Sequence, residues 1–362
     1  MGARLDRWKI GLALGVATLA VGAFVAVALL GASGPAKGAW RVVSIPEGAT
    51  ESEVAAQLVD EGAVPSALVV RLAFALARGG DVVPGEHLVP GDASPRELVP
   101  LLTRDPDRPK ARVVLPEGLH RIAIAERLES AGIATKSAFL AATIDPRVLE
   151  AAGVPRGKSG LPESAEGFLF PATYELAVDS SAAEVVARLV REWRSRYDRL
   201  AKKHAQGAAR LADMLGWGPR EIVTLASIVE KETGAADERP LIAGVFQNRL
   251  TREDFTPRLL QSDPTSAYAC VVEPDEAPGC AGFDGKPTPE TNRDPENRYS
   301  TYTHEGLPPG PIANPGEAAI AAVLAPAETR ALYFVAKGGG RHAFSESYEE
   351  HQRAVDAWRR SR

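Results

Sequence analysis

The stretch ASIVEKETGAADERPLIAGVFQNRL, residues 226–250, predicts two helices joined by a turn, and it places Glu230 and Glu232 where the first helix ends. Pro219 suits the start of that helix and Gly234 suits its end. Most of the other side chains on this helix are apolar, and a carboxylate on an apolar wall costs free energy unless a function requires it. The end of this helix is therefore the first candidate for catalysis.

The two glutamates cannot act as a facing pair. Residues two apart on a helix point about 200° away from each other, because one turn takes roughly 3.6 residues. One of Glu230 and Glu232 would then be catalytic, and the other would be structural and paired with Arg239 or Arg249 of the following helix. Helix geometry alone does not say which glutamate has which role.

The composition excludes several classes of protein. The chain has 362 residues, 45% of them hydrophobic, which is enough for about two packed domains. Its net charge of -5 and its dispersed Lys and Arg residues give no basic surface for nucleic acid. The two cysteines, Cys270 and Cys280, have no metal-ligand spacing with a nearby His, so no metal and no other cofactor is expected.

The N-terminus predicts a membrane anchor. Residues 10–32 carry no charge and are long enough to cross a hydrocarbon core of about 30 Å, while the basic residues within 1–9 stay in the cytoplasm. A cleaved signal peptide is the alternative, but its apolar region is usually shorter, at about 7–15 residues. We expect a single-pass protein of the cytoplasmic membrane, a linker over residues 33–40 and an extracytoplasmic remainder. There the two cysteines could form a local disulfide or stay as free thiols.

Residues 41–178 contain an internal repeat. VVSIPEGATESEVAAQLVDEGAV, from Val42, returns as RVVLPEGLHRIAIAERLESAGIA, from Arg112, with the same Pro-Glu-Gly tripeptide 70 residues later. Each copy predicts a short strand, a turn and a helix ended by Gly, and the second copy continues into an apolar strand, EGFLFPATYEL, at residues 166–176. Such a unit looks like a carbohydrate-binding module of the LysM type, although a spacer is the alternative.

Residues 179–362 predict a mainly helical domain. Ser181 and Glu184 form a capping box for a helix that reaches about His204. Further helices are expected from Asp237 to Leu250, briefly after Asp263, and from about Tyr348. Residues 270–298 have no periodicity and are expected to form a long surface loop. The run YSTYTHEGLPPGPIANPG predicts a rigid polar loop from Tyr299, and a β-hairpin should follow at residues 332–345. The predicted fold class is α+β.

Five motifs in this order resemble the YceG-like (MltG) family of endolytic murein transglycosylases: ASIVEKETG, FQNRL, LLQSDPTSAY, YSTYTHEGLPPGPIANPG and LYFVAKGGGRHAFS. The resemblance covers most of the chain, including the anchor and the repeats. The family's catalytic residue is the second Glu of its E-K-E-T motif, which falls on Glu232. Glu230 would then be structural near the site, together with Arg249. The resemblance implies substrate-binding roles for Gln261, Asp263, Thr265, Tyr302, Asn314 and His342.

The sequence also departs from the family pattern. Ser262 replaces the more usual Thr, Ser300 stands where Asn is common, and the loop that bears the cysteines looks longer than usual. Neither the change at Ser300 nor the longer loop touches Glu232, but both affect the expected contacts in the cleft.

The resemblance implies cleavage of peptidoglycan glycan strands by one carboxylate. Glu232 would first donate a proton to the glycosidic oxygen and then accept one from the 6-hydroxyl of the muramoyl sugar, which closes a 1,6-anhydro ring. An apolar helix end would raise the pKa of this glutamate. A hydrolase with Asp263 or Glu230 as its second carboxylate, and a non-catalytic cell-wall scaffold, are the alternatives. Penicillin-binding proteins are the implied protein partners.

Overall fold

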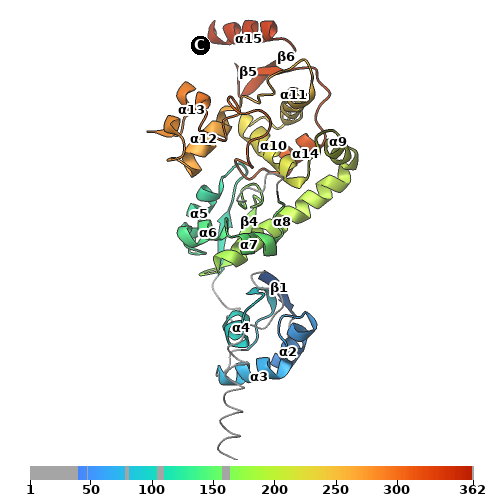
Figure 1. Ribbon diagram of the computed structural model, residues 1–362, viewed down its shortest axis with the longest axis vertical. Coiled ribbons are helices and arrows are strands. Elements are labelled where there is room, and N and C mark those ends of the chain that lie inside the picture. The colour runs from blue at the N-terminus through green and yellow to red at the C-terminus, as the bar shows by residue number, and fades with distance from the viewer. Residues whose placement is uncertain (1–39, 47, 78–80, 104–109, 157–163, 361–362) are drawn as a thin grey trace, which may run out of the picture. The chain divides into compact units, whose positions relative to one another are not determined.

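The computed structural model describes residues 40–46, 48–77, 81–103, 110–156 and 164–360 (Figure 1). The predicted membrane anchor at residues 10–32, its cytoplasmic flank and nearly all of the linker lie outside these ranges. Within them, no helix has the length and apolar character needed to cross a membrane. The chain divides into two compact units between Pro109 and Lys110, and each is described by itself. The described residues form an α+β fold that is rich in helix and has three small sheets, which confirms the predicted fold class.

The first unit contains the first copy of the repeat. Its two strands pair antiparallel, with Trp40 opposite Pro90, and two helices lie between them in the chain. The first helix begins with a capping box between Thr50 and Glu53, which satisfies two backbone N–H groups at its start. The core of this unit is built from buried side chains of all these elements. The elements are β1 (Trp40–Ile45), α2 (Glu51–Asp60), α3 (Ala67–Leu76), β2 (Gly85–Pro90) and α4 (Pro95–Leu102).

The second copy of the repeat opens the second unit. Its outer strands again pair antiparallel, and its closing strand comes from the predicted apolar segment at residues 166–176. Gly48 and Gly118 follow the equivalent turns with the same φ of 76°, a left-handed conformation that glycine adopts without strain. The strand, turn and helix expected in each copy are confirmed. The elements are β3 (Lys110–Val114), α5 (Arg121–Ser130), α6 (Lys136–Ala142), α7 (Pro146–Ala152) and β4 (Thr173–Ala177).

Four of the remaining helices, α8, α9, α10 and α11, pack around one short apolar helix, α14. The capping box at Ser181 and the long helix to Lys203 are confirmed, and Trp193 of that helix is buried between the rings of Phe168 and Tyr197. The second copy packs on the same helix through α6 and α7. The elements are α8 (Ala182–Lys203), α9 (Ala205–Leu215), α10 (Pro219–Glu232), α11 (Arg239–Thr251), α12 (Asp263–Val272) and α14 (Glu317–Leu324).

Because of this packing, the predicted domain boundary at residue 178 does not coincide with the division between the compact units. The second copy shares its unit with the helices that follow, whereas the first copy belongs to the other unit. The repeat in the sequence shows that the two copies are alike, but it carries no information about what each copy packs against.

The C-terminal elements were largely predicted. The hairpin of β5 (Tyr333–Gly338) and β6 (Arg341–Ser345) and the closing helix α15 (Tyr348–Arg360) are confirmed. Residues 270–298 are not only a loop, because they contain the 3-10 turn η1 (Pro278–Cys280) and the short helix α13 (Pro289–Arg293). Elements this short show no hydrophobic period in the sequence.

Candidate active site

Glu232 is the last residue of α10, a helix whose preceding residues 222–229 are all buried. Thr233, which follows it, has an extended backbone (φ -144°), so the helix ends at Glu232 and Gly234 lies just past its end, as predicted. The Oγ of Ser262 donates a hydrogen bond to one carboxyl oxygen of Glu232. Burial raises the pKa of Glu232 to about 7, and the nearby charge of Asp263 adds to this, while the Ser262 hydrogen bond and the Arg249 charge act in the opposite direction. Glu232 is therefore substantially protonated near neutral pH.

Asp263 is exposed at the first position of α12, and two donors hold one of its oxygens. The hydroxyl of Tyr302 lies 2.5 Å from Oδ1, and the Nδ2 of Asn292 lies 2.8 Å from the same atom. Burial and the neighbouring Asp263 raise the pKa of Tyr302 well above its ordinary value, so its hydroxyl remains a donor. The position of Asp263 at a helix N-terminus also favours its negative charge.

The turn before α12 is fixed by two buried threonines. The backbone N–H of Gln261 donates to the carbonyl of Thr301 (3.0 Å), and the N–H of Ser262 donates to the Oγ1 of Thr301 (3.0 Å). Thr265 donates to the carbonyl of Ser262 (2.7 Å) and its hydroxyl contacts that of Thr301. Thr265 is thus placed inside this turn, whereas Gln261 has an exposed side chain and a left-handed backbone (φ 52°), which is uncommon outside glycine.

Arg249 lies behind the site and joins three segments. Its Nε donates to the carbonyl of Leu332 (2.6 Å), its Nη1 donates to the carbonyl of Leu260, and its guanidinium lies 5.6 Å from the centre of the Tyr333 ring. The side chain is buried, which lowers the pKa of its guanidinium. Its positive charge is one of the two influences that lower the pKa of Glu232.

Glu230 has different partners. Its carboxylate forms an ion pair with Arg239 (2.9 Å) and accepts the N–H of Gly316 (3.1 Å), and only 6% of its side chain is exposed. Of the two candidate partners in the sequence, Arg239 is therefore the one that pairs with Glu230. A carboxylate enclosed by a cation and a backbone donor has little access to a substrate.

Asn314 joins the second copy of the repeat to the loop before α14. Its Nδ2 donates to Glu166 (2.7 Å) and to the carbonyl of Leu119 (2.9 Å), while its Oδ1 accepts the N–H of Leu169 (2.8 Å). The residue is only 1% exposed. The structure therefore gives Asn314 protein partners and does not bring it, among the residues described, into the hydrogen-bonded group around Glu232.

Glu166 is a buried carboxyl that sequence reasoning missed. It accepts hydrogen bonds from the N–H of Arg121 (2.9 Å) and the hydroxyl of Tyr268 (3.0 Å) as well as from Asn314. Burial raises its pKa to about 7 in spite of these donors. The available signal was an acidic residue directly before the apolar run GFLF at residues 167–170.

His342 lies on β6 and pairs with Glu238, which precedes α11. Its Nδ1 is 2.8 Å from one carboxylate oxygen, and its backbone N–H donates to the other (3.1 Å). As with Asn314, the partners of His342 within the described ranges are not those of Glu232. The predicted disulfide is present, and it joins Cys270 to Cys280 with a Cα–Cα distance of 5.0 Å.

No group of three or more potential metal ligands occurs in the described parts of the chain. A cavity of about 660 Å³ lies between α9 and α11, with Arg210, Gly244 and Arg330 among its lining residues. Neither Glu232 nor its hydrogen-bonding partner Ser262 lines this cavity, so the cavity is not part of the candidate active site.

The fold and the site together define a class of protein with two repeated strand–helix modules and a helical domain in which a half-buried glutamate ends a helix. The sequence model of the YceG-like family matches residues 43–357, so the chain belongs to that family. A crystal structure of a putative yceG-like protein from Listeria monocytogenes is similar, with a TM-score of 0.54 and 26% identity, covering 87% of this chain and 98% of that one.

Curated relatives from two species carry the name endolytic murein transglycosylase. The protein from Bacillus subtilis (strain 168) is 30% identical over 194 residues, which cover 53% of this chain and 48% of the relative. The protein from Streptococcus pneumoniae serotype 2 (strain D39) is 28% identical over 341 residues, which cover 86% of this chain and 57% of the relative. The chain thus spans about half the length of the curated relatives it matches.

Proposed function

We propose that this protein is an endolytic lytic transglycosylase that cleaves the bond between N-acetylmuramic acid and N-acetylglucosamine within peptidoglycan strands. The observation that carries the proposal is the position of Glu232, where burial raises the pKa of one carboxyl group to about 7. A general acid is most effective when its pKa lies near the working pH. The names of the two relatives support the same activity.

In the proposed reaction, protonated Glu232 donates its proton to the glycosidic oxygen as the bond to the anomeric carbon breaks. The resulting carboxylate then accepts the proton of the 6-hydroxyl of the same muramoyl sugar, and that oxygen bonds to the anomeric carbon to give the 1,6-anhydro end. Glu232 finishes the cycle protonated. No water is consumed, so one carboxyl group is sufficient, whereas hydrolytic glycosidases generally use two.

The other predicted site residues fall into two groups. Gln261, Asp263 and Tyr302 contact the glycan in our proposal, because Gln261 and Asp263 are exposed and Tyr302 is held beside Asp263. The negative charge of Asp263 would also stabilise positive charge that develops at the anomeric carbon. Thr265, Asn314 and His342 act by positioning, since their polar groups already bind protein partners.

The cellular context follows from the same proposal. Residues 10–32 would anchor the chain in the cytoplasmic membrane with the N-terminus inside. A disulfide between Cys270 and Cys280 agrees with an oxidising, extracytoplasmic compartment. The LysM-like copies would bind glycan or hold the catalytic part at a distance from the membrane, and penicillin-binding proteins would supply the nascent strands whose elongation the cleavage ends.

The test is the Glu232→Gln variant on purified glycan strands, with mass spectrometry of the products. Removing the acid should lower the release of anhydro-ended fragments by about 10²- to 10⁴-fold. Glu253→Gln, a change at an exposed glutamate, is the matched control and should keep full activity. Full activity in a folded Glu232→Gln protein would refute the proposal.

A hydrolase remains the second candidate because Asp263 offers a second, exposed carboxylate close enough to influence the pKa of Glu232. Glu230 is a poorer candidate, since it is enclosed with Arg239. Hydrolysis would give reducing ends one water heavier than the anhydro products, so the same mass spectra separate the two reactions.

A further inference from the structure

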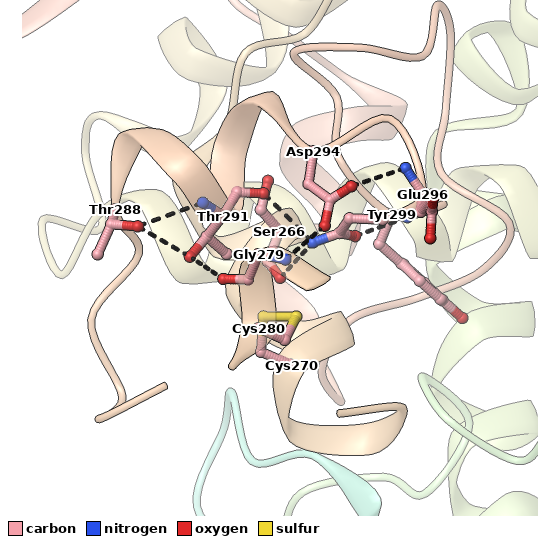
Figure 2. The surroundings of a disulfide bond; sticks show 10 residues. Ser266, Cys270, Gly279, Cys280, Thr288, Thr291, Asp294, Glu296 and Tyr299 are labelled. Carbon is pink, nitrogen blue, oxygen red and sulfur yellow. Dashed lines mark hydrogen bonds between the residues drawn. A yellow bond between two sulfur atoms is a disulfide. The ribbon is translucent and has the colours of Figure 1, made fainter. Parts of the chain in front are cut away.

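The disulfide constrains the segment between α12 and Tyr299. Cys270 lies in the last turn of α12 and Cys280 ends η1, so the bond fixes η1 against the helix that begins at Asp263. Both cysteines are buried and pack with Ala277. Figure 2 shows the disulfide directly beneath the residues that join η1 to α13.

Those residues hold α13 closely against η1. The N–H of Gly279 donates to the Oδ2 of Asp294 (2.7 Å), and the hydroxyl of Thr291 donates to the carbonyl of Gly279 (3.1 Å), as Figure 2 shows. A Cβ added to Gly279 would lie only 2.9 Å from the carbonyl oxygen of Glu290. The residue next to Cys280 therefore helps to hold α13 in position, together with the direct packing of α13 on α12.

On its other side α13 reaches the candidate active site. The Nδ2 of Asn292 donates to the Oδ1 of Asp263 (2.8 Å), the oxygen that also accepts the Tyr302 hydroxyl. The hydroxyl of Ser300 donates to the carbonyl of Asn292 (2.5 Å) and accepts the N–H of Tyr302 (3.3 Å). Asn292 thus bonds directly to Asp263 and is linked through Ser300 to Tyr302, and both of these are among the residues that we propose bind the glycan beside Glu232.

The amide of Asn292 has one favourable orientation. Its Oδ1 is buried and has no hydrogen-bond partner among the described residues. Its Nδ2 donates a hydrogen bond to the carboxylate of Asp263. A rotated amide would place its oxygen against the negatively charged Asp263, which is unfavourable. Two donors on a single oxygen of Asp263 then fix the plane of that carboxylate.

We propose that Asn292 is a positioning residue that orients the Asp263 carboxylate for the reaction at Glu232, and that the Cys270–Cys280 disulfide keeps Asn292 in place. This inference rests on the proposed function. It assigns a catalytic purpose to a segment that shows no periodicity in the sequence and that the motifs do not include. Asp263, held in one orientation, presents its charge to the substrate in the same way in each catalytic cycle.

A double-mutant cycle tests the role of Asn292. Asn292→Ala should lower kcat about tenfold, the lower end of the effect expected for one hydrogen bond to a charged group, with KM changed less than twofold. In an Asp263→Ala background the same change should have no further effect, because its target is gone. An equal tenfold loss of kcat in both backgrounds, or no loss in either, would overturn the proposal. The proposal would also fail if thermal unfolding showed that a lower folded fraction at the assay temperature accounts for the loss of kcat.

The disulfide is tested with the Cys270→Ser/Cys280→Ser variant in the full chain. It should show the same fall in kcat as Asn292→Ala, and combining the two should give no further fall. Gly279→Ala keeps the disulfide but displaces α13, so it tests the same link if the double serine variant does not fold. Wild-type kcat in folded Gly279→Ala and double serine proteins would overturn this part.

Glu232→Gln separates this inference from the proposed function. If Glu232→Gln retains activity, the proposed function fails. If it is inactive while Asn292→Ala behaves as wild type, only the role of Asn292 fails.

Discussion

Replacing Ser262 with Ala should raise the pKa of Glu232 further above its already elevated value. The Ser262 hydroxyl donates to the carboxyl oxygen of Glu232 and so stabilises the charged form, and it is the larger of the two influences that lower the pKa. A hydrogen bond to a charged group contributes about 1.5–3 kcal/mol, which corresponds to roughly one to two pKa units. The Ser262→Ala variant should therefore hold its proton to a higher pH.

This change in pKa should appear in the pH dependence of the reaction. A general acid must be protonated at the start of the cycle, so kcat/KM of the wild-type protein should fall as pH rises through about 7. In Ser262→Ala the same fall should occur about one to two pH units higher. Asp263→Asn removes a negative charge while keeping an oxygen that can accept from Tyr302, so it should move the fall to lower pH.

The assay is the initial rate of release of anhydro-ended fragments from purified glycan strands between pH 5 and pH 9. Because burial also raises the pKa of Glu166 to about 7, Glu166→Gln is the necessary control, and it should leave the pH profile in place. Opposite displacements in Ser262→Ala and Asp263→Asn would support the argument. Profiles that move in the same direction, or a fall that disappears in Glu166→Gln, would refute it.

Three further predictions concern stability. Glu232 and Glu166 both have a pKa raised from 4.5 to about 7, so between these pH values the native state binds more protons than the unfolded chain. The free energy of unfolding, measured with denaturant, should therefore fall as the pH rises from about 4.5 to 7, by up to roughly 3 kcal/mol for each group. Glu166→Gln should make that fall smaller. Gly207→Ala should destabilise the protein by about 1–3 kcal/mol in a urea titration, because the added Cβ would lie 1.7 Å from the carbonyl oxygen of Leu324. Gly234→Ala, where an added Cβ meets open space, should have a far smaller effect in the same titration. Glu230→Ala should cost about 3–5 kcal/mol in thermal or urea unfolding by leaving Arg239 unpaired in a mostly buried position, and a stability equal to that of the wild type would contradict its structural role.

The elements that the sequence predicts well are those with a clear period or a local signal. The capping box at Ser181, the helix that starts at Pro219 and the C-terminal hairpin depend on residues close together in the chain, and all are present. The strand, turn and helix of each repeat copy are present too, although β1 and β3 pair with the distant strands β2 and β4. Several helices were not predicted: α3, α4, α6 and α7 in the repeat region, and α9, α13 and α14 after it. Helix α14 is apolar throughout, so its pattern does not distinguish a buried helix from a buried strand.

The site was predictable to a smaller extent, because its contacts join residues far apart in the chain. Helix geometry separated Glu230 from Glu232, and the choice of Glu232 came from the family resemblance. Ser262 is 30 residues from Glu232, and Asn292 is 29 residues from Asp263. Neither contact has a local signature, and a loop of irregular composition can place an amide in almost any direction.

The second copy of the repeat helps to determine where Glu232 lies. Its Pro-Glu-Gly turn contacts the end of α10, since the carbonyl of Gly118 accepts a hydrogen bond from the Nζ of Lys231 (3.3 Å). The N–H of Gly118 also donates to the backbone carbonyl of Asn314 (2.9 Å), in the loop before α14. In the same turn the carboxylate of Glu117 lies so close to Gly316 that an added Cβ there would be 1.9 Å from its oxygen.

These contacts involve the residues directly before Glu232. The carboxyl group of Glu232 itself accepts a hydrogen bond from Ser262 and is influenced by the charge of Asp263. A pKa that depends mainly on burial depends on the position of the helix end, because a small displacement would admit water to the carboxyl group. The second copy therefore stabilises the feature on which the proposed chemistry depends, whether or not it also binds glycan.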